Sequence, residues 1–283
     1  MRIDLHTHSN VSDGTEDPEV LIGSAAAAGL DAVALTDHDS TAGWDRARSA
    51  AHGLGITFIP GMEVSCRTDT GISVHMLSYL HDPLHPGLHA EIERSRTARL
   101  TRARRMVDLM SVDYPISWDL VAQHVSEGAT VGRPHIADAL VSLGIVRTRS
   151  EAFQSVLTAC SPYWVSHYAP HPAEAVGLIR AAGGVPVFAH PSASNRGAVV
   201  GGADLEEMID AGLLGLEVEH RDNPAAAQVA LRRIARERGL LVTGSSDYHG
   251  SGKPNLLGEN LTAPEVLEAI QGLATGTATG AAL

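Results

Sequence analysis

The sequence His6-Thr7-His8-Ser9-Asn10-Val11-Ser12-Asp13-Gly14 follows an apolar and polar run, Met1-Arg2-Ile3-Asp4-Leu5, that predicts a short first strand. Positions i and i+2 of a strand point to the same face, so His6 and His8 can bind one cation together. Asp13 stands on a turn that ends at Gly14, from where its carboxylate can reach a second cation. The stretch therefore predicts a metal centre at the C-terminal end of a strand and, with it, hydrolytic chemistry.

The order of strand, polar loop and helix repeats along the chain. We expect further strands at residues 31–36, 56–60, 72–80, 185–189, 215–219 and 240–244. We expect helices at residues 17–29, 41–52, 173–182, 223–238 and 264–273. This alternation predicts parallel strands joined by crossover helices, an arrangement in which barrel enzymes place their active sites at the C-terminal strand ends.

The region 82–172 departs from this pattern. Helical periodicity covers residues 88–110, 118–125 and 134–143, and no convincing strand occurs there. We therefore predict an α/β barrel made of residues 1–81 and 173–283. Residues 82–172 form a helical insert that contributes to the substrate site.

Composition narrows the class of protein. The chain of 283 residues is 44% apolar and 19% charged, which is typical of a soluble globular enzyme. It has no apolar run of 18 residues and no N-terminal secretory signal, so we expect a cytoplasmic protein that does not bind membranes. The two cysteines, Cys66 and Cys160, are expected to be unpaired thiols.

The net charge is −12, which argues against duplex nucleic acid as a partner. Bound cations would reverse the charge locally, so a small phosphorylated substrate is favoured.

Five strand ends carry side chains that ligate metals, namely the clusters His6/His8/Asp13, Asp37/His38, Glu63 with His75, and Asp247/His249, together with His190. Imidazole and carboxylate ligands suit zinc, manganese or iron, and the absence of a nearby thiolate argues against a structural zinc finger. A mononuclear hydrolytic site needs only three protein ligands. Because the candidates exceed that number, we predict a multinuclear centre.

These segments resemble the signature of the polymerase and histidinol phosphatase (PHP) domain phosphoesterases. The matching segments, in order, are His6-Thr-His8, Thr36-Asp37-His38, Gly61-Met-Glu63, Val74-His75, Ala189-His190-Pro191 and Ser246-Asp247-Tyr-His249. The resemblance covers essentially the whole chain apart from details of the insert. It implies a distorted (β/α)7 barrel that binds up to three metal ions.

The resemblance also implies three ligand sets. The first ion would be held by His6, His8, Glu63 and Asp247, the second by Glu63, His75 and His190, and the third by Asp13, His38 and His249. Glu63 would bridge the first two ions and is thereby a catalytic residue. Two cations about 3.5–4 Å apart can share a hydroxide with a lowered pKa, which attacks phosphorus in line with the leaving oxygen. The cations also neutralise charge on the phosphoryl oxygens.

The insert supplies candidate substrate-binding residues. Arg133 opens a helix in the segment Gly132-Arg-Pro-His135 and can fork onto a phosphate, while His135 either contacts substrate or caps the helix. Arg99 and Arg102 are neighbours on one helix face, and one of them can reach a second phosphate. His167 stands where relatives carry a similar Val-x-His segment.

The Arg-Pro-His segment resembles the PHP subset that includes nucleoside 3′,5′-bisphosphate phosphatases and short-RNA 5′–3′ exonucleases. We therefore predict a metal-dependent phosphatase that hydrolyses phosphate monoesters of small nucleotides, either a nucleoside 3′,5′-bisphosphate or a short oligonucleotide such as single-stranded RNA. Asp39 and His220 are candidate proton donors to the leaving alkoxide, and a purely structural role for either stays open.

Other functions are also open at this point. Histidinol phosphate and a cyclic ribose phosphate are alternative substrates. Amidohydrolysis is disfavoured because no lysine stands between the metal strands to form a carbamate bridge. A non-catalytic PHP module is disfavoured because every ligand position is filled. The remaining histidines are expected to be solvated, namely His52, His81, His85, His89, His124 and His171.

Overall fold

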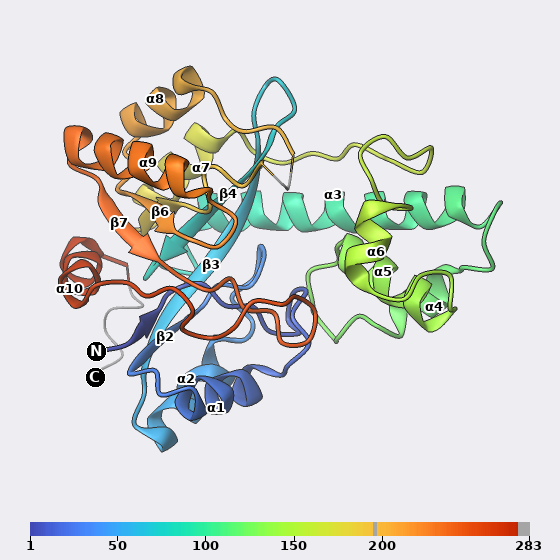
Figure 1. Ribbon diagram of the computed structural model, residues 1–283, viewed down its shortest axis with the longest axis horizontal. Coiled ribbons are helices and arrows are strands. Elements are labelled where there is room, and N and C mark those ends of the chain that lie inside the picture. The colour runs from blue at the N-terminus through green and yellow to red at the C-terminus, as the bar shows by residue number, and fades with distance from the viewer. Residues whose placement is uncertain (195–196, 277–283) are drawn as a thin grey trace.

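Seven strands form one sheet in which each strand pairs with its neighbours in the sequence (Figure 1). The computed structural model describes residues 1–194 and 197–276. The strands are β1 (Ile3–Asp4), β2 (Ala32–Leu35), β3 (Thr57–Arg67), β4 (Ser73–Tyr79), β5 (Val185–Phe188), β6 (Gly215–Glu219) and β7 (Leu241–Gly244). Just beyond β1 and β7, Thr7 forms a parallel bridge with Tyr248. The first and last strands therefore approach one another, and the sheet curls into a nearly closed barrel.

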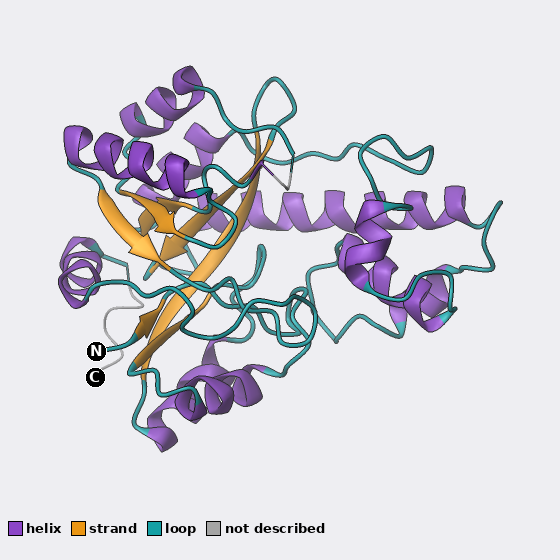
Figure 2. Cartoon of the chain, viewed as in Figure 1, coloured by secondary structure: helices purple, strands orange, loops and turns teal. Residues whose placement is uncertain are grey.

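Helices cover the outside of this sheet and extend to one side of it (Figure 2). They are α1 (Pro18–Ala27), α2 (Trp44–Leu54), α3 (Pro86–Met110), α4 (Trp118–Ala122), α5 (Arg133–Ser142), α6 (Arg149–Gln154), α7 (Pro172–Ala181), α8 (Gly202–Asp210), α9 (Ala225–Arg238) and α10 (Pro264–Leu273). The structure thus has the expected mixed α/β barrel.

The local sequence explains most helix ends. Pro18 occupies the first turn of α1, where its missing N–H costs nothing. Gly55 ends α2 with φ +68°, a left-handed conformation that glycine adopts without a Cβ clash. Two helices are missing from the sequence prediction. α6 has six residues, too few to show a period, and α8 starts at a Gly-Gly pair without a side-chain cap.

The prediction that all strands are parallel is wrong at β4, which runs antiparallel to both β3 and β5. Only residues 68–72 separate β3 from β4, whereas a parallel crossover needs a dozen residues or more. The reversal places His75 near the start of its strand, opposite Ser65 near the end of β3. A residue at the beginning of β4 can therefore join residues at the C-terminal ends of the other strands.

Alternate residues of five strands pack into one apolar cluster, as the two-residue period of a strand requires. The cluster contains Ile3, Leu5, Ala32, Ala34, Ile59, Leu77, Tyr79, Val185, Val187 and Ala189. The Tyr79 hydroxyl donates to the Leu5 carbonyl over 3.0 Å, and α10 packs Leu267 and Ile270 against the same cluster. Apolar side chains thus fill this part of the barrel interior.

Residues 82–172 contain α3 to α6 and no strand. The first turns of α3 pack on the barrel through Leu88 and Ile92. The second half of α3 packs with α4, α5 and α6 in a separate apolar cluster that includes Met106 and Leu140. In Figure 1 these helices lie at one end of the molecule, on the far half of α3. The insert therefore has a core of its own, while its exact boundaries stay a prediction.

Two further expectations concern cysteines and membranes. Both cysteines are free thiols, with Cys66 buried and Cys160 exposed. Within the described residues, no helix combines the length and the apolar character that crossing a membrane requires.

The expectation that His81 is solvated is wrong. Its side chain is fully buried. The His81 ring is tilted against Trp44 with 5.0 Å between the ring centroids, and its Nδ1 lies 2.7 Å from the Ser78 hydroxyl. Burial lowers the pKa of His81 from 6.5 to about 4. His81 lies in a loop just after β4, and nothing in the local sequence indicated that it would be buried.

The buried His81 predicts a pH dependence of stability. Between pH 6.5 and about 4, the unfolded chain binds a proton at this residue that the folded chain does not bind. The free energy of unfolding should therefore fall with decreasing pH, by about 1.4 kcal/mol per pH unit from this group. In urea denaturation at several pH values, His81→Gln should flatten the slope, and His52→Gln on the exposed face of α2 should not. Equal slopes for His81→Gln and the unmodified protein would contradict the assignment.

Candidate active site

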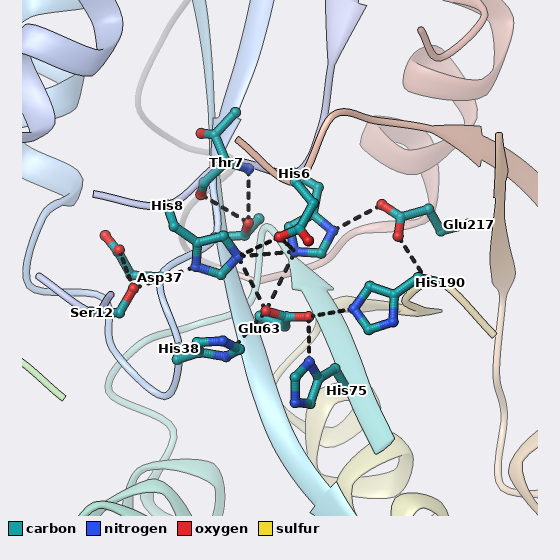
Figure 3. A network of polar contacts seen from close by, with 12 residues as sticks. His6, Thr7, His8, Ser12, Asp37, His38, Glu63, His75, His190 and Glu217 are labelled. Carbon is teal, nitrogen blue, oxygen red and sulfur yellow. Dashed lines mark hydrogen bonds and ion pairs between the residues drawn. The ribbon is translucent and has the colours of Figure 1, made fainter. Parts of the chain in front are cut away.

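The nine side chains predicted to bind metal gather at one end of the barrel, where most appear in Figure 3. They come from the loops after β1, β2, β5 and β7, from β3 and from the start of β4: His6, His8, Asp13, His38, Glu63, His75, His190, Asp247 and His249. Eight of them are buried and His75 is partly exposed. The structure thus brings together residues that are far apart in the sequence.

In the first predicted ligand set, two carboxylates lie close to the same two imidazole nitrogens. Glu63 Oε2 lies 3.4 Å from His6 Nε2 and 3.2 Å from His8 Nε2. Asp247 Oδ1 lies 3.5 and 3.4 Å from the same two nitrogens. Two imidazoles and two carboxylates therefore face one point.

The second set uses the other oxygen of Glu63. Oε1 lies 2.9 Å from His75 Nδ1 and 3.2 Å from His190 Nε2. Because the two oxygens of Glu63 face two different groups of imidazoles, its position fits a bridging ligand (Figure 3).

The third set is built around Asp13. Its Oδ1 lies 3.1 Å from His249 Nε2, and its Oδ2 lies 3.7 Å from His38 Nε2. His8 is close enough to join this group, since its Nδ1 is 3.7 Å from Asp13 Oδ1. The rings of His8 and His249 lie 4.1 Å apart between centroids, so the first and third sets are adjacent.

The donor atoms fit divalent cations. His38 Nδ1 lies 3.1 Å from Glu63 Oε2 and His249 Nε2 lies 3.1 Å from Asp13 Oδ1, yet neither nitrogen has an aligned hydrogen bond within the described residues. Buried nitrogens without partners are costly, and a cation between nitrogen and oxygen would satisfy both. Imidazole and carboxylate donors are the ligands of zinc, manganese and iron sites.

The electrostatics of the site also favour positive charge. Burial disfavours a charged imidazole, but Asp247 and Glu63 raise the pKa of His8 to about 9. Burial likewise disfavours ionised Glu63, but His75, His38 and His6 hold its pKa well below the usual range. Raised pKa values occur at His6 and His8, whereas burial lowers the pKa of His38 and of His249.

Glu217 supports this cluster and was missed in the sequence analysis. It is fully buried in β6, its Oε1 lies 2.9 Å from His6 Nδ1, and its Oε2 accepts the His190 backbone N–H over 2.8 Å (Figure 3). The contact orients the His6 ring so that Nε2 faces the first set. The sequence did contain a signal for this position. Leu216 and Val218 are apolar and pack in the core on one face of β6, so Glu217 between them faces the barrel interior.

Strained backbone positions direct several of these side chains. Asp39, His190 and Asp247 have φ values of +49°, +33° and +54°, in the left-handed region that residues other than glycine rarely adopt. Such positions cost about 1–3 kcal/mol each and persist where surrounding contacts hold them. All three stand next to predicted ligands or are ligands themselves.

The two predicted proton donors are fully buried and form other contacts. Asp39 Oδ2 lies 2.8 Å from Arg99 Nε, and the Ser65 N–H and hydroxyl donate to its two oxygens over 2.8 Å each. His220 Nδ1 accepts the Asp222 N–H over 3.0 Å, and its Nε2 lies 3.7 Å from Asp247 Oδ2. These contacts favour a role in which Asp39 holds Arg99, whereas His220 Nε2 faces Asp247 without an aligned hydrogen bond.

A cavity of about 1110 Å³ lies against the metal cluster. Five of the predicted ligands line it, namely Asp13, His38, His75, His190 and His249. Four side chains predicted to bind substrate also line it, namely Arg99, Arg102, Arg133 and His167, together with three arginines that the sequence analysis did not select, namely Arg67, Arg149 and Arg221. The cavity therefore joins the metal cluster to a cationic surface.

The arginines that line the cavity differ in their acidic partners. Arg99, Arg149 and Arg221 pair with Asp39, Asp138 and Glu259, respectively. Arg102 Nε donates to the Val165 carbonyl over 2.8 Å and Arg133 Nη1 to the Leu157 carbonyl over 3.2 Å, and neither pairs with a carboxylate among the described residues. Burial and the other arginines lower the pKa of Arg102 to about 9 and that of Arg133 to about 10. An anion bound here would relieve this repulsion.

Aromatic rings hold two of these guanidinium groups. The Trp164 ring centroid lies 4.5 Å from the Arg102 Cζ and 5.0 Å from the Arg133 Cζ, and Phe153 lies 5.1 Å from Arg133. Both rings also line the cavity. The cationic surface thus has flat apolar faces beside it, as nucleobase binding needs.

The two histidines predicted to bind substrate differ in whether they line the cavity. His167 lines the cavity, and burial together with the nearby arginines lowers its pKa to about 2, so it is neutral. His135 is buried, and its Nδ1 accepts the Gly132 N–H over 3.1 Å. Since His135 is not among the cavity-lining residues, its contacts favour capping of α5 over binding of substrate.

Comparison with known proteins agrees with this arrangement. Residues 4–160 match the PHP domain. The chain is 34% identical to a 3′,5′-nucleoside bisphosphate phosphatase of Chromobacterium violaceum over 89% of this chain and 88% of that protein. It is 33% identical to a 5′-3′ exoribonuclease of Haemophilus influenzae over 92% of this chain and 94% of that protein. A solved structure from Bifidobacterium adolescentis, inferred to be a metal-dependent phosphoesterase, is 43% identical, covers 96% of each chain and superposes with a TM-score of 0.93.

A nearly closed seven-stranded α/β barrel with clustered imidazoles and carboxylates at one end defines a metal-dependent phosphoesterase, a hydrolase of phosphoric esters. The chain belongs to the PHP domain family.

Glu217 provides a test of how the site is oriented. Glu217→Gln keeps the shape of the side chain but removes the charge that fixes His6, so metal affinity should fall by about 10–100-fold. Calorimetric titration with Mn²⁺ or Zn²⁺ measures the change. The matched control is Glu219→Gln on the same strand, whose carboxylate pairs with Arg232 at the surface. Equal affinities in the two variants would show that Glu217 does not position the ligands.

Proposed function

We propose that this protein hydrolyses a phosphate monoester of a small nucleotide that carries a second phosphate, either a nucleoside 3′,5′-bisphosphate or a short oligonucleotide. One observation carries the proposal: a single cavity is lined both by predicted metal ligands and by Arg67, Arg102 and Arg133, which have no carboxylate partner among the described residues. A substrate with phosphates at two positions could place one phosphate at the predicted metal ligands and the other at the arginines. The names of the two curated relatives support the same substrate class.

We assign the metal ligands as three sets: His6, His8, Glu63 and Asp247; Glu63, His75 and His190; and Asp13, His38 and His249. Two or three Mn, Zn or Fe ions bound there would activate water at neutral pH and neutralise phosphoryl charge. Glu63 holds the first two sets at a fixed separation through its two oxygens. Glu217 and the left-handed turns orient the ligands before substrate arrives.

The arginines orient the substrate. Arg133 and Arg102, stacked on Trp164, present guanidinium groups to the second phosphate, and Arg67 lines the same cavity. Arg99 is held by Asp39 and Ser65. Fixing both phosphates aligns the reacting phosphorus with the metal cluster, which lowers the entropic cost of reaction. Asp39 and His220 as proton donors stay predictions.

The bridging carboxylate provides the first test of this function. The metal-loaded protein should release phosphate from a nucleoside 3′,5′-bisphosphate, and exhaustive chelation should abolish release. Glu63→Ala should lower kcat by at least about 10³-fold, because both proposed ions lose a ligand. Metal content by mass spectrometry should fall in parallel. The control is Glu237→Ala, a surface carboxylate on α9 that should retain activity and metal content. Unchanged turnover in Glu63→Ala would refute the assignment.

The second phosphate provides another test. Arg133→Met should raise KM for the bisphosphate at least about 10-fold, the loss expected for one charge-assisted hydrogen bond, and should hardly change KM for a nucleoside monophosphate. Arg147→Met serves as control because its side chain is 89% exposed. Equal effects on the two substrates would argue against a second phosphate at these arginines.

A substrate panel separates the remaining alternatives. Faster turnover of histidinol phosphate or of a cyclic ribose phosphate than of the bisphosphate would replace the proposed substrate. A metal-replete protein that hydrolyses no phosphoester would favour a non-catalytic module.

A further inference from the structure

The chain contains a single lysine, Lys253, against twenty arginines. It lies in the loop between β7 and α10, four residues after His249. Its Nζ is 3.0 Å from Oδ2 of Asp247, a proposed ligand of the first ion. The only ammonium side chain of the protein therefore stands beside the metal cluster.

The loop that carries Lys253 is held firmly. Asn255 Nδ2 donates to the Ser246 carbonyl over 2.6 Å, and the Ser251 N–H donates to the Thr15 hydroxyl over 2.9 Å. Gly252 packs on Arg149 of the insert so closely that a Cβ there would lie 2.4 Å from Arg149 Nη1. The contacts around the loop thus determine where the ammonium group lies.

The two oxygens of Asp247 face different partners. Oδ1 faces His6 and His8 in the first set, whereas Oδ2 faces Lys253 and, at 3.7 Å, His220. Asp247 is 1% exposed, but the Lys253 side chain is 31% exposed and lines the same cavity as the metal ligands and the arginines. Lys253 therefore connects a buried ligand to the space where substrate would bind.

An ammonium group has three donors that rotate freely, and one of them suffices for Asp247. Among the described residues, Nζ has no second acceptor. Lysine presents a compact point charge, which can approach a phosphoryl oxygen beside clustered cations where the wide arginine fork is less suited. Lys253 comes from the barrel, whereas Arg102 and Arg133 come from the insert. Cationic groups from both the barrel and the insert therefore line the cavity.

We propose that Lys253 is a substrate-binding residue that contacts the phosphoryl group being hydrolysed, while the arginines of the insert hold the second phosphate. The inference rests on the proposed function, since it assumes a phosphate at the metal cluster. It differs from a structural role for Lys253, in which the ammonium would only hold Asp247 in place.

Selective acetylation tests the contact without turnover. An N-hydroxysuccinimide ester can modify only Lys253 and the α-amine of Met1, which is 48% exposed and serves as an internal control. Peptide mass spectrometry measures the acetylation rate at each amine. In the metal-loaded protein, inorganic phosphate should slow the acetylation of Lys253 and leave the acetylation rate of the Met1 amine unchanged. Equal Lys253 rates with and without phosphate would overturn the proposal.

Substitution separates the two roles of Lys253. Lys253→Met should lower kcat/KM for the bisphosphate by about 10–100-fold with metal content unchanged, and Lys253→Arg should recover part of the loss. A variant that loses metal in proportion to activity would assign Lys253 a structural role and overturn the proposal. If the unmodified protein hydrolyses the bisphosphate and Lys253→Met matches it, only the Lys253 inference fails. If the unmodified protein hydrolyses no phosphomonoester, the proposed function fails, and the acetylation result stands on its own.

Discussion

The carboxylate of Glu63 lies within 3.4 Å of five imidazoles, and the rest of the site is arranged around this contact. Burying so many ionisable groups together is costly unless the charges are compensated. A divalent cation satisfies nitrogen and oxygen donors at the same time, whereas a proton satisfies only one pair. The packed apolar interior below the site excludes water from one side, so the compensation must come from the ligands and from the cavity.

The distribution of charge across the cavity explains how an acidic protein can bind an anion. The net charge of −12 describes the whole surface, but the cavity wall of the insert carries arginines of which two lack acidic partners in the described residues. Stacking on Trp164 holds these guanidinium groups without neutralising them. The charge of this cavity wall therefore has the opposite sign to the net charge of the protein, and the local charge decides which ligand binds.

The reversal of β4 and the fixed loops give the site its geometry. An all-parallel barrel would contribute ligands only from strand C-terminal ends, and the antiparallel β4 adds His75 from a strand start. Arg149 links the insert to the metal site by donating to Asp138 over 2.5 Å and to the Asp13 carbonyl over 2.7 Å. Barrel and insert are thereby coupled at the third ligand set, close to the loop that bears Lys253.

The sequence by itself determined the chemistry of the ligands, most strand positions and the helical nature of the insert, because residue types and local periodicity are properties of neighbouring residues. Only the tertiary structure decided the direction of β4, the burial of His81, the pairing of Glu217 with His6 and the neighbours of Asp39. Glu217 and His6 are 211 positions apart. No local pattern encodes such a contact, since it forms only when the barrel closes and brings distant strand ends to one place.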